Sequence, residues 1–433
     1  MSLDKLFEFI KTSPTAYNAV ENLGKMFEKN GFSHIDEGEK WRLEHGGKYY
    51  VTRNRSSIIA FVLPEDVPQS FKITASHSDS PLFKLKDNFE KAENGYIKAD
   101  TEKYGGMILS TWLDRPLSVA GRLIVKDKNG ALKTKIVDLE RPMLVIPNMP
   151  PHLNRELNNG YVYNPQVDMM PITGVGEADG GIIEQAAMKA GCSVQDIMSY
   201  DLYVYCCEEP TYLGVGRDMF MAPRIDNLEC AFASVQAITA AKCSGGINMC
   251  CVFDNEEVGS GTKQGADGTV LSDTIARIAE NLGMTAEQTR IVLASSLMIS
   301  ADNAHALHPN HPEKYDGLNA PLPNGGVVIK YNANGKYTSD GVSAGMFKEI
   351  CKKAGVPTAV FANRSDTAGG STLGNISNSH VSINTVDIGL AQLAMHSAVE
   401  TAGVYDFDHM KNAMTAFYES SIKSIGDGEY EVN

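Results

Sequence analysis

Short apolar runs recur along the chain, and many of them are followed by stretches with the spacing of amphipathic helices. The run Ile247–Phe253 has the length and composition of a buried strand in a parallel sheet. Further strands are predicted at residues 48–53, 57–63, 71–76, 291–300, 327–331, 358–362 and 381–386. Helices are predicted at residues 1–11, 14–30, 228–242, 272–282, 340–354 and 407–425. This alternation predicts an α/β fold.

The pattern changes between about Leu82 and Met219. Short β-like runs in this part are broken by Gly, Pro and Asn, and no regular alternation of strand and helix is visible. We therefore predict a β-rich domain at residues 82–219, inserted into a discontinuous α/β domain formed by residues 1–81 and 220–433.

Composition narrows the class of protein. The chain has 433 residues, 43% apolar and 21% charged, as in globular proteins, and its formal net charge of −14 argues against nucleic acid or an anionic membrane as partner. No apolar run is long enough to span a membrane, and the amphipathic, partly acidic start does not have the pattern of a signal peptide. Eight cysteines without a CxxC motif indicate reduced thiols, so we expect a cytoplasmic location.

Residues that bind metals or protons follow several predicted strands. Taken singly, each is also consistent with an ordinary loop residue. Because the carboxyl ends of parallel strands share one edge of a sheet, residues far apart in sequence can meet there. Two histidines and three carboxylates suit a pair of zinc-like ions, with one carboxylate bridging them, although manganese or cobalt also suits such ligands. The five candidate ligands are His77, Asp226, Glu257, Asp302 and His396.

Two further acids have positions suited to supporting roles. Glu256 precedes the candidate ligand Glu257, so its side chain points in a different direction and is free to act as the acid/base that transfers protons. Asp79, two residues after His77, is placed to accept a hydrogen bond from the imidazole. The chain lacks the His-Glu-x-x-His motif, which excludes the helix-borne mononuclear zinc peptidase plan.

The same residues lie in blocks that resemble the aspartyl aminopeptidase family, M18-type dinuclear-zinc metallopeptidases of the cytosol, along nearly the whole chain. The blocks are SPT at 13–15, HSDSP at 77–81, APRIDN at 222–227, DNEEVGS at 254–260, SADNAHALHPN at 300–310, VIKYN at 328–332 and QLAMHS at 392–397. The resemblance implies that His77 and Asp302 hold one Zn²⁺, that Glu257 and His396 hold the other, that Asp226 bridges them and that Glu256 is the general base.

The resemblance also implies a fold, an assembly and a substrate class. The expected fold is an α/β/α zinc-peptidase domain with an inserted β-rich dimerisation domain, and homodimers are expected to assemble into closed homododecamers. A loop histidine, here His152, is expected to reach the neighbouring subunit's active site. The expected substrates are peptides with an amino-terminal Asp or Glu, bound by Lys330 with His305 and Tyr337 beside it.

Other functions remain compatible with the sequence. Residues 366–370 read DTAGG where relatives carry DSPCG, which leaves a broader or neutral aminopeptidase specificity open. A deacylase or carboxypeptidase uses similar metal ligands, and a carboxypeptidase needs an arginine for the substrate carboxylate, for which Arg224 and Arg364 are candidates. A non-catalytic assembly protein on the same fold is a third alternative, which the presence of Glu256 disfavours.

Overall fold

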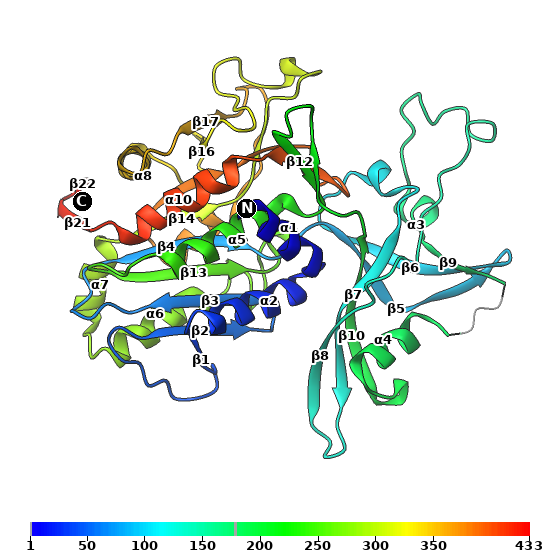
Figure 1. The fold of residues 1–433 in the computed structure, drawn as a ribbon, viewed down its shortest axis with the longest axis horizontal. Helices are drawn as coiled ribbons and strands as arrows, with labels where there is room; N and C mark the ends of the chain where they lie inside the picture. The colour runs from blue at the N-terminus through cyan, green and yellow to red at the C-terminus, as the bar shows by residue number, and fades with distance from the viewer. Residues whose placement is uncertain (1, 177–179) are drawn as a thin grey trace.

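The computed structural model describes residues 2–176 and 180–433, in which the largest sheet has nine strands in the order β1-β2-β3-β13-β4-β14-β18-β16-β17 (Figure 1). The four strands β13, β4, β14 and β18 are parallel to one another, so their carboxyl ends lie at one edge. The strands are β1 (Ser33–His34), β2 (Lys48–Arg53), β3 (Ser57–Val62), β13 (Ile247–Phe253), β4 (Phe71–His77), β14 (Leu297–Ala301), β18 (Asn384–Gly389), β16 (Val327–Tyr331) and β17 (Thr358–Ala362).

Helices cover both faces of this sheet because alternate residues of its strands point to opposite sides. In β13, Cys250 and Val252 pack into one core while Met249 and Cys251 pack into the other. The first core is completed by α1 (Ser2–Thr12), α2 (Ala16–Lys29), α5 (Ile225–Ala240), α8 (Gly341–Lys353) and α10 (Asp406–Glu419). The second is completed by α6 (Val270–Asn281), α7 (Ala286–Ala294) and α9 (Leu373–Asn378). The predicted α/β/α class is confirmed.

A second sheet carries its own core on the right of Figure 1. Its strands run in the order β8-β7-β10-β5-β6-β9, each antiparallel to its neighbours, and Ile182 and Ala186 of α4 (Ile182–Ala190) pack against it. The strands are β5 (Leu82–Glu93), β6 (Tyr96–Tyr104), β7 (Leu117–Lys126), β8 (Leu132–Asp138), β9 (Ile172–Val175) and β10 (Ile197–Cys206), and a short helix α3 (Pro165–Asp168) precedes β9. We call this part the inserted unit.

A third sheet joins segments that surround the edge where the parallel strands end. Its order is β11-β12-β20-β19-β15, and β12 leads directly into α5. The strands are β11 (Thr211–Leu213), β12 (Met219–Ala222), β20 (Glu400–Gly403), β19 (Ala391–Leu393) and β15 (Ala304–His305). We propose that residues 82–219 form a domain inserted into the α/β domain.

No helix in the described part of the chain has both the length and the apolar character needed to cross a membrane.

Three predicted elements differ from the structure. The strand predicted at residues 381–386 is shifted toward the carboxyl end and forms β18 at Asn384–Gly389. The apolar segment 291–300 was expected to be one strand, but α7 extends through Ala294 because Thr285 and Gln288 form a capping box that starts the helix, and β14 begins at Leu297. The last helix ends at Glu419 instead of residue 425, since residues Ile422–Gly426 form β21, which pairs with β22 (Glu429–Val432).

The end of α10 is held by a buried lysine. Lys72, in the middle of β4, is fully buried and its Nζ donates to the carbonyl of Ser420 at 2.8 Å, to that of Ser244 at 2.9 Å and to that of Tyr418. A helix end leaves carbonyl groups without partners in the helix, and a lysine there satisfies them.

We expect Lys72→Met to lower the free energy of unfolding by about 3 kcal/mol, because it leaves buried carbonyl groups without donors. Chemical denaturation measures this loss. The matched control is Lys353→Met, which removes an exposed lysine that also donates to a carbonyl, that of Val432 at 2.6 Å, and should change stability by less than about 0.5 kcal/mol. Equal losses in the two variants would contradict the role of Lys72.

Candidate metal centre

Three neighbouring parallel strands deliver acids and a histidine to the same edge of the large sheet. His77 is the last residue of β4, and its backbone lies opposite Phe253, the last residue of β13. Glu256 and Glu257 follow in a single 3-10 turn, and Asp302 follows β14 directly. Their convergence is therefore a consequence of strand register.

Two further elements complete the cluster. Asp226 lies in the first turn of α5, directly after β12, and His396 lies between β19 and β20 of the third sheet. The structure thus brings all five predicted ligands, His77, Asp226, Glu257, Asp302 and His396, into one place.

The five side chains form two groups that share Asp226. In the first group, Nε2 of His77 lies 3.5 Å from Oδ1 of Asp226 and 3.6 Å from Oδ1 of Asp302. In the second, Nε2 of His396 lies 3.5 Å from Oδ2 of Asp226 and 3.3 Å from Oε2 of Glu257. Each oxygen of the Asp226 carboxylate therefore faces a different histidine.

These distances fit metal ligands better than ion pairs. They exceed the usual length of a charge-assisted N–H···O bond, about 2.7–2.9 Å. Two ligand atoms bound tetrahedrally at about 2.0–2.1 Å from one zinc ion lie about 3.3–3.4 Å apart. Oδ1 of Asp226 and Oε1 of Glu257 are buried and find no hydrogen-bond partner in the described part of the chain. Because burying a carboxylate oxygen without a partner is costly, this donor set fits divalent cations.

The second nitrogen of each histidine is held from outside the cluster. Nδ1 of His77 lies 3.1 Å from the backbone oxygen of Asp79 and 3.4 Å from its carboxylate Oδ1. Nδ1 of His396 lies 2.7 Å from the backbone oxygen of Gly106. A proton on each Nδ1 leaves Nε2 unprotonated and directed at the cluster, which is the arrangement that metal-binding histidines need.

Asp79 also holds the two glutamates. Its Oδ1 and Oδ2 accept the backbone N–H groups of Glu256 and Glu257, each at 3.2 Å, and Oδ2 accepts the hydroxyl of Tyr104 at 2.7 Å. Tyr104 belongs to β6 and Gly106 follows it, so the inserted unit supports the cluster from one side. Tyr104 and Gly106 are not predicted from the sequence, because no local pattern in the β-rich segment shows that a tyrosine hydroxyl and a backbone carbonyl lie beside a site formed by distant residues.

Acidic groups outnumber histidines in the cluster, and this excess of carboxylates shifts the pKa values of its members. Burial, together with the charges of Asp302, Asp79 and Asp226, raises the pKa of Glu256 to about 8, and burial also raises the pKa of Glu257. Burial by itself would lower the pKa values of His77 and His396. The nearby carboxylates have the larger effect, so the pKa of His77 is raised and the pKa of His396 is raised to about 10. Divalent cations would reverse these shifts, because they favour ionised acids and neutral imidazoles.

Glu256 differs from the other acids of the cluster. One of its carboxylate oxygens lies within 4.8 Å of ligand atoms of His77 and Glu257. Among the described residues, its carboxylate accepts no hydrogen bond. It is therefore close to the centre and free to exchange a proton.

The predicted substrate residues have different surroundings. Lys330 is buried, and its Nζ donates to the backbone oxygens of Asp302 at 2.8 Å and Asn303 at 3.3 Å and lies 3.4 Å from Oδ2 of Asp302. Its ammonium group also lies 5.2 Å from the centre of the Tyr337 ring. The rings of His305 and Tyr337 both pack against Phe361, so these two residues lie near each other.

The other predicted or alternative residues form no hydrogen bond or ion pair with the side chains of the cluster in the described part of the chain. His152 is exposed on the loop before α3, in the inserted unit, and forms no hydrogen bond or ion pair with the described cluster residues. Arg224 is buried, and its Nη2 donates to the backbone oxygen of Ile10 at 3.0 Å. Arg364 is bound bidentately by Asp366, with Nε–Oδ1 and Nη2–Oδ2 distances of 2.9 and 2.7 Å.

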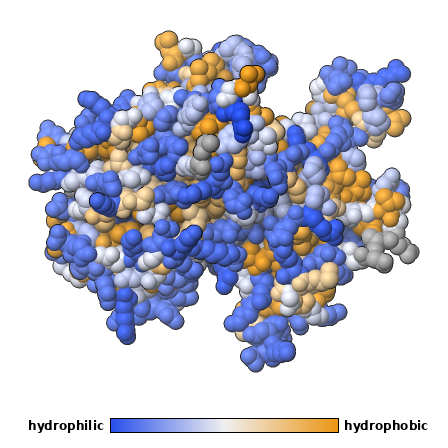
Figure 2. Space-filling model, viewed as in Figure 1, coloured by the Kyte–Doolittle hydropathy of each residue, from blue (hydrophilic) through white to orange (hydrophobic). Residues whose placement is uncertain are grey.

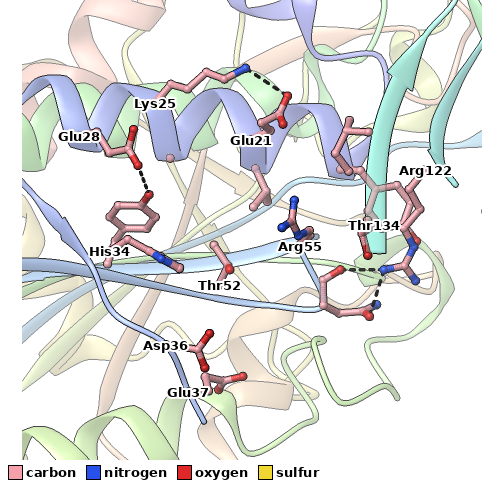
Figure 3. A pocket seen from close by; sticks show the side chains of 16 residues that line it. Glu21, Lys25, Glu28, His34, Asp36, Glu37, Thr52, Arg55, Arg122 and Thr134 are labelled. Atoms are coloured by element: carbon pink, nitrogen blue, oxygen red, sulfur yellow. Dashed lines mark hydrogen bonds and ion pairs between the residues drawn. The ribbon is translucent and has the colours of Figure 1, made fainter. Parts of the chain in front are cut away.

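A cavity of about 590 Å³ between α2, the β2–β3 hairpin and the inserted unit does not contain the cluster. Figure 3 shows that several of its charged side chains bind one another or nearby polar groups. Lys25 pairs with Glu21 at 3.1 Å, and Arg122 donates to the backbone oxygen and Oδ1 of Asn54 at 3.0 and 3.2 Å. None of the five cluster residues lines this cavity, so its large volume does not make it the candidate metal site.

Comparisons with known proteins agree with the chemistry of the cluster. Residues 9–418 match the family described as Aminopeptidase I zinc metalloprotease (M18). The chain is 43% identical over 422 residues to a probable M18 family aminopeptidase 2 of Clostridium acetobutylicum, covering 96% of this chain and 98% of that protein. Its fold is similar to a cryo-EM structure of the Ape4 and Nbr1 complex, with a TM-score of 0.93, 33% identity and coverage of 96% and 85%. It is also similar to the mApe1 dodecamer of S. cerevisiae, with a TM-score of 0.85, 27% identity and coverage of 96% of both chains.

Proposed function

Because the chain belongs to the M18 family of zinc aminopeptidases, we propose that it removes amino-terminal residues from peptides, preferably Asp or Glu, at a centre of two zinc ions. The observation that carries this proposal is the carboxylate of Asp226, whose two oxygens face the Nε2 atoms of two different histidines at 3.5 Å each. A carboxylate in that position is suited to bridging two ions.

The five cluster residues divide into ligands for the two ions. His77 and Asp302 would hold one, Glu257 and His396 the other, and Asp226 both. Zinc in such a site supplies Lewis-acid chemistry, which polarises the scissile carbonyl and makes water nucleophilic near neutral pH. Manganese or cobalt would suit the same histidine and carboxylate ligands.

Glu256 transfers the proton in this proposal. Its carboxylate takes a proton from the attacking water and delivers it to the nitrogen of the leaving peptide. The hydrogen bond from its backbone N–H to Asp79 fixes the turn on which it lies. Its half-buried carboxylate has no hydrogen-bond partner among the described residues, which suits a group that must be a base in one step and an acid in the next.

The pairing of Arg364 weighs against its use as the carboxylate-binding arginine of a carboxypeptidase with the same metal ligands. That reaction needs a cation free to bind the terminal carboxylate of the substrate. Arg364 binds Asp366 through Nε and Nη2, so its guanidinium is already paired. Arg224 is buried and donates only from Nη2, and its Nε and Nη1 have no partner among the described residues. An experiment separates the functions: the zinc-loaded protein should cleave Asp-, Glu- and Leu-anilides and lose this activity with a chelator, while blocked amino termini should not be cleaved.

Lys330 supports a preference for acidic residues. Its ammonium is the cation beside Asp302, and burial strengthens the attraction between such a charge and a carboxylate. Three oxygens already surround it, so a substrate carboxylate would share it with Asp302 and Asn303.

We expect Lys330→Met to reduce kcat/KM for Asp- and Glu-anilides by about 10- to 100-fold more than for Leu-anilide. A charge-assisted hydrogen bond contributes about 1.5–3 kcal/mol, and each 1.4 kcal/mol is tenfold. The measurement is the ratio of kcat/KM between acidic and neutral substrates in both proteins. Equal losses on all substrates would assign Lys330 to holding Asp302 and not to substrate choice.

An apolar surface on the inserted unit supports assembly into homodimers and, by analogy with the mApe1 dodecamer, into homododecamers. Orange patches cover part of this unit in Figure 2. The loop and helix between residues 147 and 168 expose Met149, Leu153, Val162 and Val167, and all of these except Val162 line a cavity of about 700 Å³. His152 is exposed on the same loop, and we propose that in the dimer it reaches the neighbouring subunit's centre, as the family resemblance implies.

We expect Leu153→Glu to dissociate the oligomer, because it places a charge in an apolar contact. Light scattering after size exclusion measures the mass of the assembly. The control is Leu132→Glu, which changes another exposed leucine, on the β7–β8 hairpin, and should leave the mass of the assembly unchanged. His152→Ala should keep the assembly but lower kcat, and an unchanged kcat would remove His152 from the proposed active site.

A further inference from the structure

Glu400 lies beneath the metal cluster and binds the backbone of two of its members. It is the first residue of β20 and is 2% exposed. Its Oε2 accepts the N–H of Asp226 at 2.9 Å, and its Oε1 accepts the N–H of His396 at 2.7 Å. One carboxylate thus joins two residues that are 170 positions apart in the chain and belong to the same three-residue group.

The backbone at His396 needs this support. Its φ of 67° lies in the left-handed region, which non-glycine residues rarely adopt and which costs about 1–2 kcal/mol. The hydrogen bond from His396 N to Glu400 and the bond from its Nδ1 to Gly106 hold the residue at both ends. The direction of its Nε2 therefore depends on Glu400.

Other buried polar groups fix Glu400 in turn. Gln392 donates from Nε2 to Oε1 of Glu400 at 3.2 Å, and Oε1 of Gln392 accepts Nδ2 of Asn303 at 2.8 Å. Asn303 also donates to Oε2 of Glu229 at 3.2 Å. Because Asn303 follows Asp302, this chain of hydrogen bonds reaches a ligand of the other group as well.

We propose that Glu400 is a positioning residue for the metal centre: it binds the backbones of Asp226 and His396 together and so sets the separation between the bridging carboxylate and the imidazole. This inference rests on the proposed two-metal function. Groups that orient metal ligands typically change metal affinity or activity by about 10- to 100-fold when they are removed. Nothing in the Glu400 environment requires the carboxylate to touch the substrate.

The chain offers a matched control for a buried carboxylate that binds two backbone N–H groups. Asp406 is 1% exposed and accepts the N–H of Asn324 at 2.5 Å and that of Gly326 at 2.9 Å. Neither of these residues belongs to the cluster. Replacing either carboxylate by the isosteric amide puts an NH₂ group opposite a backbone N–H, so both variants lose a similar structural bond.

The test compares Glu400→Gln with Asp406→Asn in the full-length protein. The readouts are affinity for Zn²⁺ by chelator competition, the visible absorption spectrum with Co²⁺, thermal stability without metal, and kcat and KM. We expect Glu400→Gln to weaken one of the two Zn²⁺ sites by about 10- to 100-fold, change the Co²⁺ spectrum and lower kcat more than it changes KM. Asp406→Asn should lower stability and leave the metal readouts unchanged.

Wild-type affinities and spectrum in Glu400→Gln, or equal metal effects in Asp406→Asn, would overturn the inference while the two-metal function stands. A wild-type protein that binds fewer than two ions would overturn both. If Glu400→Gln does not fold, Gln392→Met keeps the carboxylate and removes one of its restraints. A smaller loss at the same Zn²⁺ site is then expected, and no loss overturns the inference.

Discussion

Glu256→Gln should lower kcat by about 10³-fold while the protein keeps both metal ions, because general acid–base catalysis contributes about 10²–10⁴-fold. Glutamine has the shape of glutamate but cannot take a proton from water. The carboxylate of Glu256 lies within reach of the cluster and forms no hydrogen bond with the described residues, so little but proton transfer should be lost.

Steady-state kinetics with the best acidic anilide and zinc analysis of the same sample check this prediction. Metal content and thermal stability serve as internal controls, since a fall in either would show that the substitution has disturbed the centre. A kcat within about tenfold of wild type, with full metal content, would rule out Glu256 as the group that moves the proton.

Asp226→Asn should have the largest effect on metal binding. The variant keeps the shape of the side chain but removes a negative charge that both ions would share, and Asp226 is 3% exposed. We expect both Zn²⁺ affinities to fall by more than about 100-fold, which is the upper range for residues that only orient ligands. Activity should fall to that of chelator-treated wild type.

A second aspartate–histidine pair provides the control. Asp267 lies on the surface, 2.8 Å from Nε2 of His380, and belongs to no candidate metal group. Asp267→Asn should bind zinc and cleave substrate as wild type does. Zinc should also stabilise wild type against heat by about 3–4 kcal/mol at saturating concentrations, and Asp226→Asn should lose most of that gain. Normal zinc affinity in Asp226→Asn would contradict the shared-ligand arrangement.

The α/β/α class and the convergence of three of the five candidate ligands follow from patterns visible in the sequence, whereas Asp226 and His396 reach the cluster from elements of the third sheet that the sequence pattern did not predict. His77, Glu257 and Asp302 each come directly or closely after an apolar run, and the parallel register of β4, β13 and β14 then brings them together. This reasoning works because strand ends are local features and a parallel sheet turns them into neighbours.

Other features depend on contacts that no local pattern marks. Glu400 lies between apolar and small residues at the start of a short strand, where its two backbone partners are visible only in three dimensions. Lys72 was part of a predicted strand, but its role at the end of α10 requires a segment almost 350 residues away. Segment 291–300 was misassigned because an apolar run fits both a helix and a strand, and the capping box at Thr285 decided between them.

Lys330 shows the limit of predicting a substrate contact. It is expected to bind the acidic side chain of the substrate, yet its ammonium already lies close to three oxygen atoms of Asp302 and Asn303. A sequence pattern identifies the residue type but not how many of its hydrogen bonds are already used. The comparison of acidic and neutral substrates therefore decides its role.

The central claim is that Asp226 lies between two zinc ions. Anomalous diffraction at the zinc absorption edge from crystals of the zinc-loaded protein tests it most directly. We expect two peaks per chain, one beside His77 and Asp302 and the other beside His396 and Glu257, with an oxygen of Asp226 next to each. A single peak, or two peaks that Asp226 does not separate, would contradict the two-metal centre.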